Sequence, residues 1–313
     1  MPDIVAIGEC LIELSSEKPI VTSTSFQKSF AGDTINFLVA VSRLGNSTGY
    51  ITRVANDPFK EYLLGEWEKE SIDCSEVKSV NGFNGMHFVS RLPYGEREFI
   101  YYRGGSAAST MQPSDINPRY IASAKLLHIS GIPQAISATS RQTILHAAKI
   151  AKDNNVPVSY DPNYRHQLWN QFEARDAMTE ILPYVTYLFP SCPTDTEALL
   201  STASPMTAIK SFIAEGVPIV AVTRGDDGVL VGTDKEVFKM PAYIPKTIID
   251  TTGAGDAFNG GFIHGLLEGL DIKDASLFGV VTAGLKLEIL GATTGLPKRE
   301  QAYETFHRIK NRM

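Results

Sequence analysis

Residues 250–262, DTTGAGDAFNGGF, place Asp256 among four glycines where a helix is expected to begin. Glycine adopts main-chain angles closed to other residues and lets a ligand approach the main chain closely. The N–H groups of Gly253, Ala254 and Gly255, with the positive end of the helix, would form a site for an anion such as phosphate. Asp256 could then take a proton from an attacking hydroxyl group while these amides stabilise the developing charge. The stretch therefore indicates phosphoryl transfer with Asp256 as general base.

A glycine-rich turn with a helix-capping aspartate would have the same sequence, so the stretch alone leaves two interpretations open. The chain has neither a GxxxxGK[ST] phosphate loop nor a GxGxxG motif after its first expected strand. The two commonest nucleotide-binding motifs are therefore absent. A decision between the two interpretations needs a second motif elsewhere in the chain.

The segments that must position Asp256 alternate between short β-branched runs and longer runs of helical period. This alternation predicts an α/β fold of three layers, doubly wound, with a mostly parallel sheet between two layers of helices. The expected strands are residues 3–8, 48–54, 125–130, 156–161, 187–191 and 218–223, with a hairpin over 229–241, and the expected helices are 33–45, 57–71, 137–155, 256–270, 274–290 and 299–311.

Two stretches, residues 10–32 and 85–105, read as strands without helices, and the second has an expected hairpin loop around residues 93–95. They predict a small antiparallel β lid over the carboxyl ends of the parallel strands, where ligands bind in open α/β sheets. The large nucleotide-binding and catalytic domain would then comprise residues 1–9, 33–84 and 106–313. The exposed edge of the lid is expected to pair with a second copy of the chain, which would make a homo-oligomer.

Composition excludes several classes of protein. The 313 residues carry a net charge of −6 and no dense Lys/Arg tract, so no nucleic-acid partner is expected. The three cysteines are too widely spaced for a disulfide framework or a zinc site. The N-terminal run contains Asp3, Glu9 and Glu13, unlike a signal peptide, and no run reaches the ~18 apolar residues of a membrane span. We expect a soluble, cytoplasmic protein with no membrane partner.

A second small-residue turn opens the expected helix at residues 31–45, AGDTINFLVAVSRLG. In this order, the two stretches resemble the N-terminal and C-terminal signature motifs of the ribokinase-like (PfkB) carbohydrate kinases, although Ala31 stands where that family usually has glycine. The resemblance covers the whole chain. It implies the ribokinase-like fold, ATP and Mg²⁺ as the phosphate donor, a sugar as the acceptor and a catalytic role for Asp256.

For the nucleotide, the resemblance implies that Thr223, Gly225 and Gly228 line the ATP site, together with Ser191, Gly253 and Gly255. Ser191 replaces the asparagine of an Asn-x-x-Glu motif that many relatives use to organise magnesium. The acids that follow it are Asp195 and Glu197, and Glu197 is the candidate magnesium residue. Some relatives bind a monovalent cation near the positions of Asp250 and Thr252, although a helix-capping role explains those two residues equally well.

For the acceptor, the stretches GEC.IEL, YYR.GSAAS, HISGI and DP.YR..LW resemble 2-keto-3-deoxygluconate kinases more than ribokinases or adenosine kinases. Guanidinium groups bind carboxylates in a planar, bidentate way, so two arginines near the sugar suit an acid. The residues implied in the sugar-acid pocket are Gly32, Asp33, Asn36, Phe88, Tyr101, Arg103, Ile132, Arg165 and Asp256. The histidines His87, His128 and His264 are expected to be packed or surface side chains.

The sequence thus predicts ATP-dependent phosphorylation of the terminal C6 hydroxyl of 2-keto-3-deoxygluconate. Fructokinases share part of the pattern, so a neutral-sugar kinase of the same family is the nearest alternative. A catalytically silent sugar-binding regulatory protein on the same scaffold is an alternative of another class. The sequence leaves open whether the acid has gluconate or galactonate stereochemistry.

Overall fold

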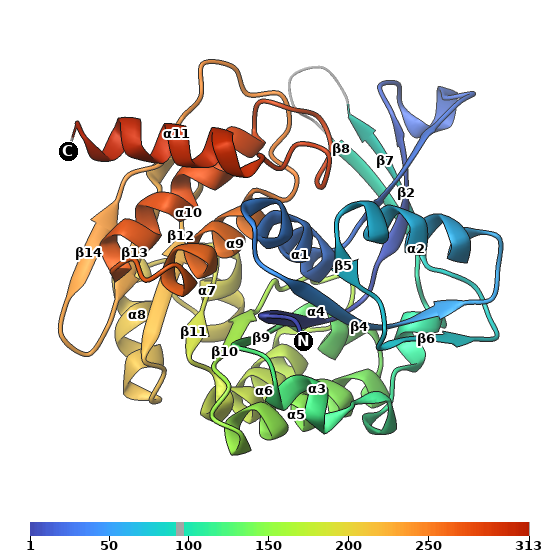
Figure 1. Ribbon diagram of the computed structural model, residues 1–313, viewed down its shortest axis with the longest axis horizontal. Helices are drawn as coiled ribbons and strands as arrows, with labels where there is room; N and C mark the ends of the chain where they lie inside the picture. The colour runs from blue at the N-terminus through green and yellow to red at the C-terminus, as the bar shows by residue number, and fades with distance from the viewer. Residues whose placement is uncertain (92–96, 313) are drawn as a thin grey trace.

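The β-branched runs of the sequence pair into one large sheet (Figure 1). The computed structural model describes residues 1–91 and 97–312, and within them this sheet has ten strands in the order β14-β13-β12-β11-β10-β9-β1-β4-β5, with β6 beside β4. The pairs from β12 to β6 are parallel, and β12, β13 and β14 are antiparallel. The strands are β1 (Ile4–Ile7), β4 (Thr48–Ala55), β5 (Ile72–Asp73), β6 (Val77–Val80), β9 (Leu126–Ser130), β10 (Val158–Asp161), β11 (Tyr187–Leu188), β12 (Ile219–Thr223), β13 (Val229–Gly232) and β14 (Val237–Met240).

Helices cover both faces of this sheet, which gives the three layers that the sequence predicts. Side chains alternate between the faces of a strand, so Ile4 and Ala6 of β1 enter one core cluster while Val5 and Ile7 enter the other. The first cluster includes α1 (Asp33–Leu44), α2 (Phe59–Lys69), α9 (Ala254–Leu267), α10 (Ile272–Lys286) and α11 (Arg299–Lys310). The second includes α3 (Pro118–Ala122), α5 (Ala138–Asp153), α6 (Gln171–Ile181), α7 (Thr194–Leu200) and α8 (Pro205–Ala214).

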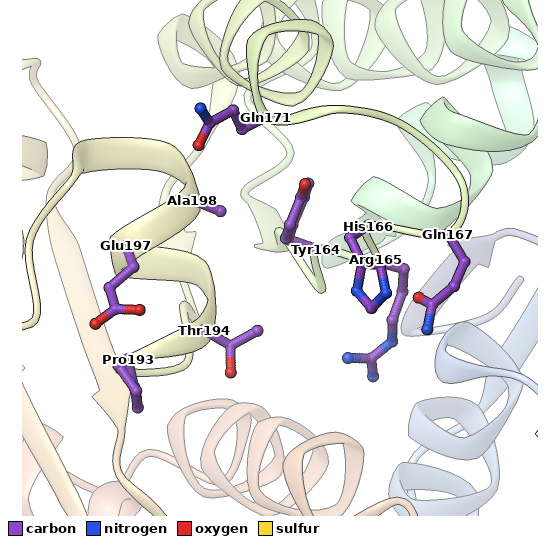
Figure 2. A pocket seen from close by; sticks show the side chains of 9 residues that line it. All are labelled: Tyr164, Arg165, His166, Gln167, Gln171, Pro193, Thr194, Glu197 and Ala198. Atoms are coloured by element: carbon purple, nitrogen blue, oxygen red, sulfur yellow. The ribbon is translucent and has the colours of Figure 1, made fainter. Parts of the chain in front are cut away.

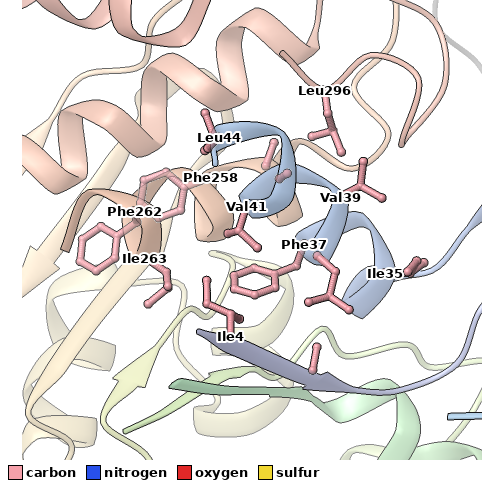
Figure 3. Packing of buried hydrophobic residues seen from close by; sticks show 14 of the residues in the cluster. Ile4, Ile35, Phe37, Val39, Val41, Leu44, Phe258, Phe262, Ile263 and Leu296 are labelled. Carbon is pink, nitrogen blue, oxygen red and sulfur yellow. The ribbon is translucent and has the colours of Figure 1, made fainter. Parts of the chain in front are cut away.

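The contact between α1 and α9 brings the two ends of the chain together. Figure 3 shows Phe37 of α1 and Ile263 of α9 in the same core, above Ile4 of β1. The glycines after Asp256 make this packing close. A Cβ on Gly260 would lie 2.8 Å from the Cβ of Ala40, and a Cβ on Gly261 would lie 2.4 Å from Oγ1 of Thr282 in α10. Gly260 and Gly261 therefore serve helix packing.

The small sheet contains β2 (Leu11–Ser16), β3 (Gln27–Ala31), β7 (Met86–Arg91) and β8 (Arg97–Tyr102), in the order β3-β2-β7-β8. All four strands lie within the two stretches predicted to form the lid. The outer pairs are antiparallel, as expected, whereas β2 and β7 in the middle are parallel. Figure 1 shows β7 and β8 projecting from the body beside α1 and α2. The hairpin loop expected around residues 93–95 lies outside the described residues.

The remaining elements are short and join the layers. They are α4 (Gly131–Ile136) and the 3₁₀ turns at Ile20–Thr22, Ala107–Thr110, Pro113–Asp115, Leu182–Tyr184 and Gly225–Asp227. The expected strand over 187–191 is shorter in the structure because β11 ends at Leu188, and Ser191 forms only an isolated bridge with Thr223. Among the described residues, no helix has the length and apolar character needed to cross a bilayer.

Candidate active site

Asp256 lies in the first turn of α9, and the glycines before it have different roles. Gly253 precedes the helix with φ of +78°, a left-handed conformation that favours glycine. Gly255 has no positive φ, which corrects the expectation that both glycines supply unusual angles. A Cβ on Gly255 would meet no atom within 4 Å. Gly255 therefore leaves open space beside the helix terminus.

The main-chain N–H groups of this turn are mostly available to a ligand. Within the described residues, the N–H groups of Gly253 and Gly255 have no hydrogen-bond partner, whereas that of Ala254 donates to the Thr251 carbonyl at 3.3 Å. Ala254 is therefore less suited to the anion site than the sequence predicts. The first N–H groups of a helix carry its positive partial charge, and two of the three expected donors are open to a ligand.

Asn36 connects the two sequence motifs. Its Nδ2 donates to Oδ2 of Asp256 at 2.7 Å, from α1 to α9. Its Oδ1 accepts from the N–H of Gly32 at 3.4 Å. A Cβ on Gly32 would lie only 2.4 Å from the Glu9 carbonyl oxygen, so the turn before α1 needs glycine at this point. The asparagine thus orients the proposed base, a role more specific than lining a pocket.

Electrostatics tune Asp256 toward neutral pH. Burial raises the pKa of Asp256 to about 7, and the nearby carboxylate of Asp33 adds to the rise. The hydrogen bond from Asn36 and the charges of Arg165 and Lys286 act in the opposite direction. A carboxylate with a pKa near the working pH is a suitable general base, because it accepts a proton readily and is still substantially ionised.

Asp33 sits close to Asp256 but is already bonded within the protein. Its Oδ2 accepts from Ser130 Oγ at 2.5 Å and from Asn163 Nδ2 at 3.0 Å, and its Oδ1 accepts from the Thr34 N–H at 2.8 Å. Burial raises the pKa of Asp33 despite these bonds. A substrate hydroxyl would therefore join a carboxylate whose orientation is already fixed by three donors.

Arg165 is the cation nearest to this group of acids. It follows β10 in an exposed loop, and its charge lowers the pKa values of Asp33, Asp195 and Asp256. Among the described residues, no carboxylate lies within ion-pair distance of its guanidinium group. Arg165 lines a pocket of about 500 Å³. Figure 2 shows Arg165 and Glu197 on opposite sides of this pocket, and Ile132 is buried in α4.

The acids after Ser191 separate into a buried and an exposed one. Asp195 is 2% exposed, and it accepts hydrogen bonds from the N–H and Oγ of Ser191 and from the N–H of Tyr164. Its oxygens are thus engaged within the protein. Glu197, three residues into α7, is exposed and lines the pocket. Within the described residues, no group of three His, Cys, Asp or Glu side chains is arranged to hold a metal ion.

The other residues predicted for the nucleotide lie at the carboxyl end of β12. Thr223 ends this strand, and its N–H donates to the Pro190 carbonyl at 3.0 Å. Gly225 and Gly228 have φ of +58° and +81°. A Cβ on Gly228 would also lie 2.2 Å from the Met240 carbonyl oxygen, whereas one on Gly225 would be in open space. Gly228 is therefore needed for the hairpin, and only Gly225 faces a volume that a ligand could enter.

Asp250 is bonded within the loop before α9, and no side chain of the described residues caps that helix. Its Oδ1 accepts from the N–H and Oγ1 of Thr252 at 2.9 and 2.7 Å, and its Oδ2 accepts from the Gly291 N–H at 2.9 Å. Burial alone would raise the pKa of Asp250, but these bonds and the charge of Lys286 hold it at about 2. The Nζ of Lys286, fully buried in α10, donates to the Asp250 carbonyl at 2.7 Å.

Arg103 and Tyr101 lie together at the base of the small sheet. The Arg103 guanidinium carbon lies 5.4 Å from the centre of the Tyr101 ring. Arg103 also forms an ion pair with Glu9, a 1% exposed residue that the sequence did not suggest as part of the site. Burial lowers the pKa of Arg103 to about 10, and the charge of Arg165 contributes. The two arginines predicted to meet the substrate are therefore close to each other.

Strand alternation corrects the expectation for Phe88. In the small sheet His87 lies opposite Tyr101, while Phe88 lies opposite Ile100. Neighbouring residues of a strand point to opposite faces, so Phe88 is on the other face from Tyr101. There its ring contacts Phe26 and Tyr102, with centroids 5.1 and 6.0 Å away. The ring that Tyr101 meets is that of His87, at 5.5 Å.

All three histidines are buried side chains, in agreement with the expectation that they are packed. His128 stacks on Phe37 at 3.7 Å and bonds to Ser159, and His264 lies between Asn46 and Tyr303. His87 is buried too, but only its Nε2 has a partner. Pairing the expected strands in register would have placed it beside Tyr101. Glu9 and Lys286 left no signal of this kind in the sequence.

Comparison with known proteins identifies the family. Residues 1–299 match the pfkB family carbohydrate kinase. This chain belongs to the pfkB family of carbohydrate kinases. It is 30% identical to a 2-dehydro-3-deoxygluconokinase of Bacillus subtilis (strain 168), over 92% of this chain and 91% of that protein. It is also 30% identical to a 5-dehydro-2-deoxygluconokinase of Clostridium perfringens, over 98% of this chain and 94% of the other.

The fold comparison agrees with the sequence comparison. A putative ribokinase II from E. coli, solved in complex with ATP and Mg²⁺, superposes with a TM-score of 0.90 at 27% identity, over 99% of this chain and 100% of that one. The pfkB kinase described here is thus a ribokinase-like sugar kinase, a phosphotransferase whose small-molecule partners are a sugar and ATP. The alternative of a catalytically silent protein is not retained.

Proposed function

We propose that this kinase transfers the γ-phosphate of ATP to the C6 hydroxyl of 2-keto-3-deoxygluconate. The observation that carries the proposal is the meeting of Asp256, Asn36 and the open amides of Gly253 and Gly255 at one helix terminus, with two arginines nearby. An acid substrate is supported by the names of the relatives, both of which act on dehydro-deoxygluconates. A neutral sugar would give the Arg165 charge no counterpart.

The reaction follows from the positions of these groups. Asp256, fixed by Asn36 at 2.7 Å, accepts the proton of the C6 hydroxyl. The oxygen then attacks the γ-phosphorus, a new O–P bond forms, and the bond to the bridging oxygen breaks to release ADP. The amides of Gly253 and Gly255 stabilise the negative charge that develops on the phosphoryl oxygens. Closure of the small sheet as a lid would bring Tyr101 and Arg103 to the sugar and exclude water.

The nucleotide is proposed to lie between Glu197 and the Thr223–Gly225 turn. Magnesium prefers oxygen ligands and usually binds through one or two carboxylates together with substrate phosphates. Glu197 fits this pattern because it is exposed at the wall of the pocket, while Asp195 is enclosed. Bound magnesium would neutralise charge on the nucleotide phosphates. Glu197 would orient it, and Ser191 holds the start of α7 through its bonds to Asp195.

The substrate is tested by a coupled assay of ADP release. 2-keto-3-deoxygluconate, 2-keto-3-deoxygalactonate, fructose, ribose and adenosine would be compared with the wild type and with Arg165→Ala. We expect the wild type to prefer a keto-deoxy acid. Loss of a charge-assisted bond should lower kcat/KM for the acid by roughly 10- to 100-fold in Arg165→Ala and change the value for fructose little.

Equal losses for the acid and for fructose in Arg165→Ala would show that this arginine does not read the carboxylate. A wild type that prefers fructose would support the fructokinase alternative instead. The galactonate substrate in the same panel decides the stereochemistry at C4.

A further inference from the structure

A buried lysine contacts the loop that leads to the proposed anion site, and the proposed mechanism gives it no part. The Nζ of Lys286, in α10, donates to the Asp250 carbonyl at 2.7 Å and lies 4.0 Å from Oδ2 of Asp250. Lys286 is fully buried and Asp250 is 3% exposed. A charge buried to this degree is costly unless it is paired and hydrogen-bonded. The fold therefore holds one positive charge at a fixed point, at the start of the loop that carries Gly253.

The oxygen atoms around this point already accept hydrogen bonds from the protein. One carboxylate oxygen of Asp250 accepts from the N–H and Oγ1 of Thr252, and the other accepts from the Gly291 N–H. The Leu287 carbonyl accepts from the N–H groups of Ile249 and Asp250 at 2.7 and 3.2 Å. These bonds join the loop before α9 to the segment that follows α10, and Lys286 ends α10 between them.

The same place is where the family resemblance raised the expectation of a monovalent cation. Such an ion needs several oxygen atoms directed at one point, because they replace its hydration shell. Here the Asp250 carbonyl is directed at the ammonium group of Lys286, which already carries the charge that the ion would bring. A second cation beside a buried ammonium group would be repelled strongly, since charges are poorly screened in the protein interior. The residues present therefore do not fit the ion.

The charge of Lys286 acts on the groups proposed for catalysis. Burial raises the pKa of Asp256, and the charge of Lys286 acts against that rise, which favours the ionised base. The segment after α10 also borders the proposed anion site directly, because a Cβ on Gly253 would lie 3.3 Å from the Cβ of Ala292. A positive charge at this position thus supports both the base and the loop that presents the Gly253 amide.

We propose that the ammonium group of Lys286 takes the place of a monovalent cation, so that this kinase works without potassium or sodium. Lys286 is a positioning residue in this scheme, because it acts through the Asp250 loop and through its charge. The inference goes beyond the proposed function, since it holds for whichever sugar the kinase phosphorylates. It also has a converse: a shorter side chain at residue 286 would leave a space, beside the Asp250 carbonyl and carboxylate, that a potassium ion can enter.

The test compares the wild type and Lys286→Ala in potassium chloride and in tetramethylammonium chloride of equal ionic strength, since tetramethylammonium is too large for such a site. ADP is measured by chromatography with the best acceptor of the substrate panel, so that no coupling enzyme responds to the salt. The wild type should have the same kcat in both salts. Lys286→Ala should lose roughly 10- to 100-fold in kcat in tetramethylammonium chloride, the effect of one charge-assisted bond. Potassium should restore most of that loss.

Lys286→Met is the matched control, because methionine removes the charge but fills most of the space. Potassium should therefore restore its activity little. Thermal melting of the same samples gives a reading that does not involve catalysis, since a ligand that binds the folded state raises Tm. Relative to tetramethylammonium, potassium should raise the Tm of Lys286→Ala and leave the Tm of the wild type and of Lys286→Met unchanged.

A wild type that is several-fold more active in potassium chloride than in tetramethylammonium chloride would overturn the inference, and this comparison needs no variant to fold. So would a Lys286→Ala variant that keeps its full kcat in tetramethylammonium chloride, or one that potassium fails to restore or stabilise. A wild type that prefers fructose would instead refute the proposed substrate and leave the salt comparison intact, so the two failures are distinguishable.

Discussion

At the scale of single residues, the proposed chemical role of Asp256 comes with a cost in stability. Its pKa is raised to about 7 by burial and by Asp33, so the folded protein resists its ionisation. The hydrogen bond from Asn36 and the charge of Arg165 recover part of that cost. The same environment makes Asp256 a stronger base than a solvated aspartate. A solvated aspartate has a lower pKa and therefore accepts a proton from a hydroxyl group less readily at neutral pH.

Asp256→Asn is therefore expected to bind sugar and ATP but to lose turnover. Asparagine keeps an oxygen that can accept the bond from Asn36, yet it cannot take up a proton. We expect kcat to fall by roughly 10² to 10⁴ while KM changes little. The measurement is steady-state ADP release with titration of both substrates. A variant that keeps most of its kcat would remove Asp256 from the role of base.

The pH dependence of the melting temperature supplies the control for Asp256→Asn. The unfolded carboxyl ionises near its ordinary value of 3.8, while the folded one stays protonated up to about 7. Wild-type stability therefore falls as pH rises through this interval, and the loss is complete above it. Asp256→Asn has no such loss, so its Tm should exceed that of the wild type by more at pH 8 than at pH 5. An inactive variant with a lower Tm at pH 8 would indicate misfolding instead.

At the scale of elements, periodicity predicted most of the helices and strands, and chain order predicted the sheet that they form. Residues 33–45 became α1, and the Asp256 helix began two residues earlier than expected, at Ala254. What the sequence did not settle was orientation across strands and around turns. The family resemblance implied Phe88 in the pocket, and the sequence of one strand could not correct this because it does not reveal the partner register. The inward orientation of Asp195 likewise depends on hydrogen bonds from Ser191 and Tyr164.

The loop before α9 depends on a helix that the sequence did not connect with it. Lys286 of α10 is fully buried, donates to the Asp250 carbonyl, and lies 4.0 Å from Oδ2 of Asp250. Removing one member of a buried ion pair leaves the other charge uncompensated. We expect Lys286→Met to lower the free energy of unfolding by about 3–5 kcal/mol in urea titrations.

Lys310→Met is the matched control, because Lys310 is an exposed lysine of α11 that pairs with Asp274. Exposed pairs contribute at most about 1 kcal/mol. The double variant Lys286→Met with Asp250→Asn should recover part of the loss, since it removes both charges. If Lys286→Met costs no more than Lys310→Met, the lysine does not hold the loop that leads to the proposed anion site.

At the scale of the molecule, the large sheet supplies a rigid base and the small sheet supplies a second, separately paired surface. The proposed catalytic groups come from α1, α9 and the loop after β10, while Tyr101 lies on β8 of the small sheet and Arg103 directly follows that strand. The proposed site would therefore be assembled only when the two sheets meet around the sugar. This arrangement suits a kinase that must exclude water from the phosphoryl group.

The outer strand of the small sheet is also the surface where we expect two copies to pair. β8 is an edge strand, and Phe99, Ile100, Tyr101 and Tyr102 on it are 39–57% exposed. Edge strands with exposed apolar side chains favour pairing with another strand. Light scattering of the wild type should thus give twice the chain mass of 34.2 kDa, and Ile100→Glu should give the mass of one chain. Val237→Glu, on the edge strand β14 of the large sheet, should stay dimeric. A monomeric wild type, or a dimer that persists in Ile100→Glu, would show that β8 does not pair two copies of the chain. The apolar side chains of β8 would then have to be covered within one copy when the lid closes.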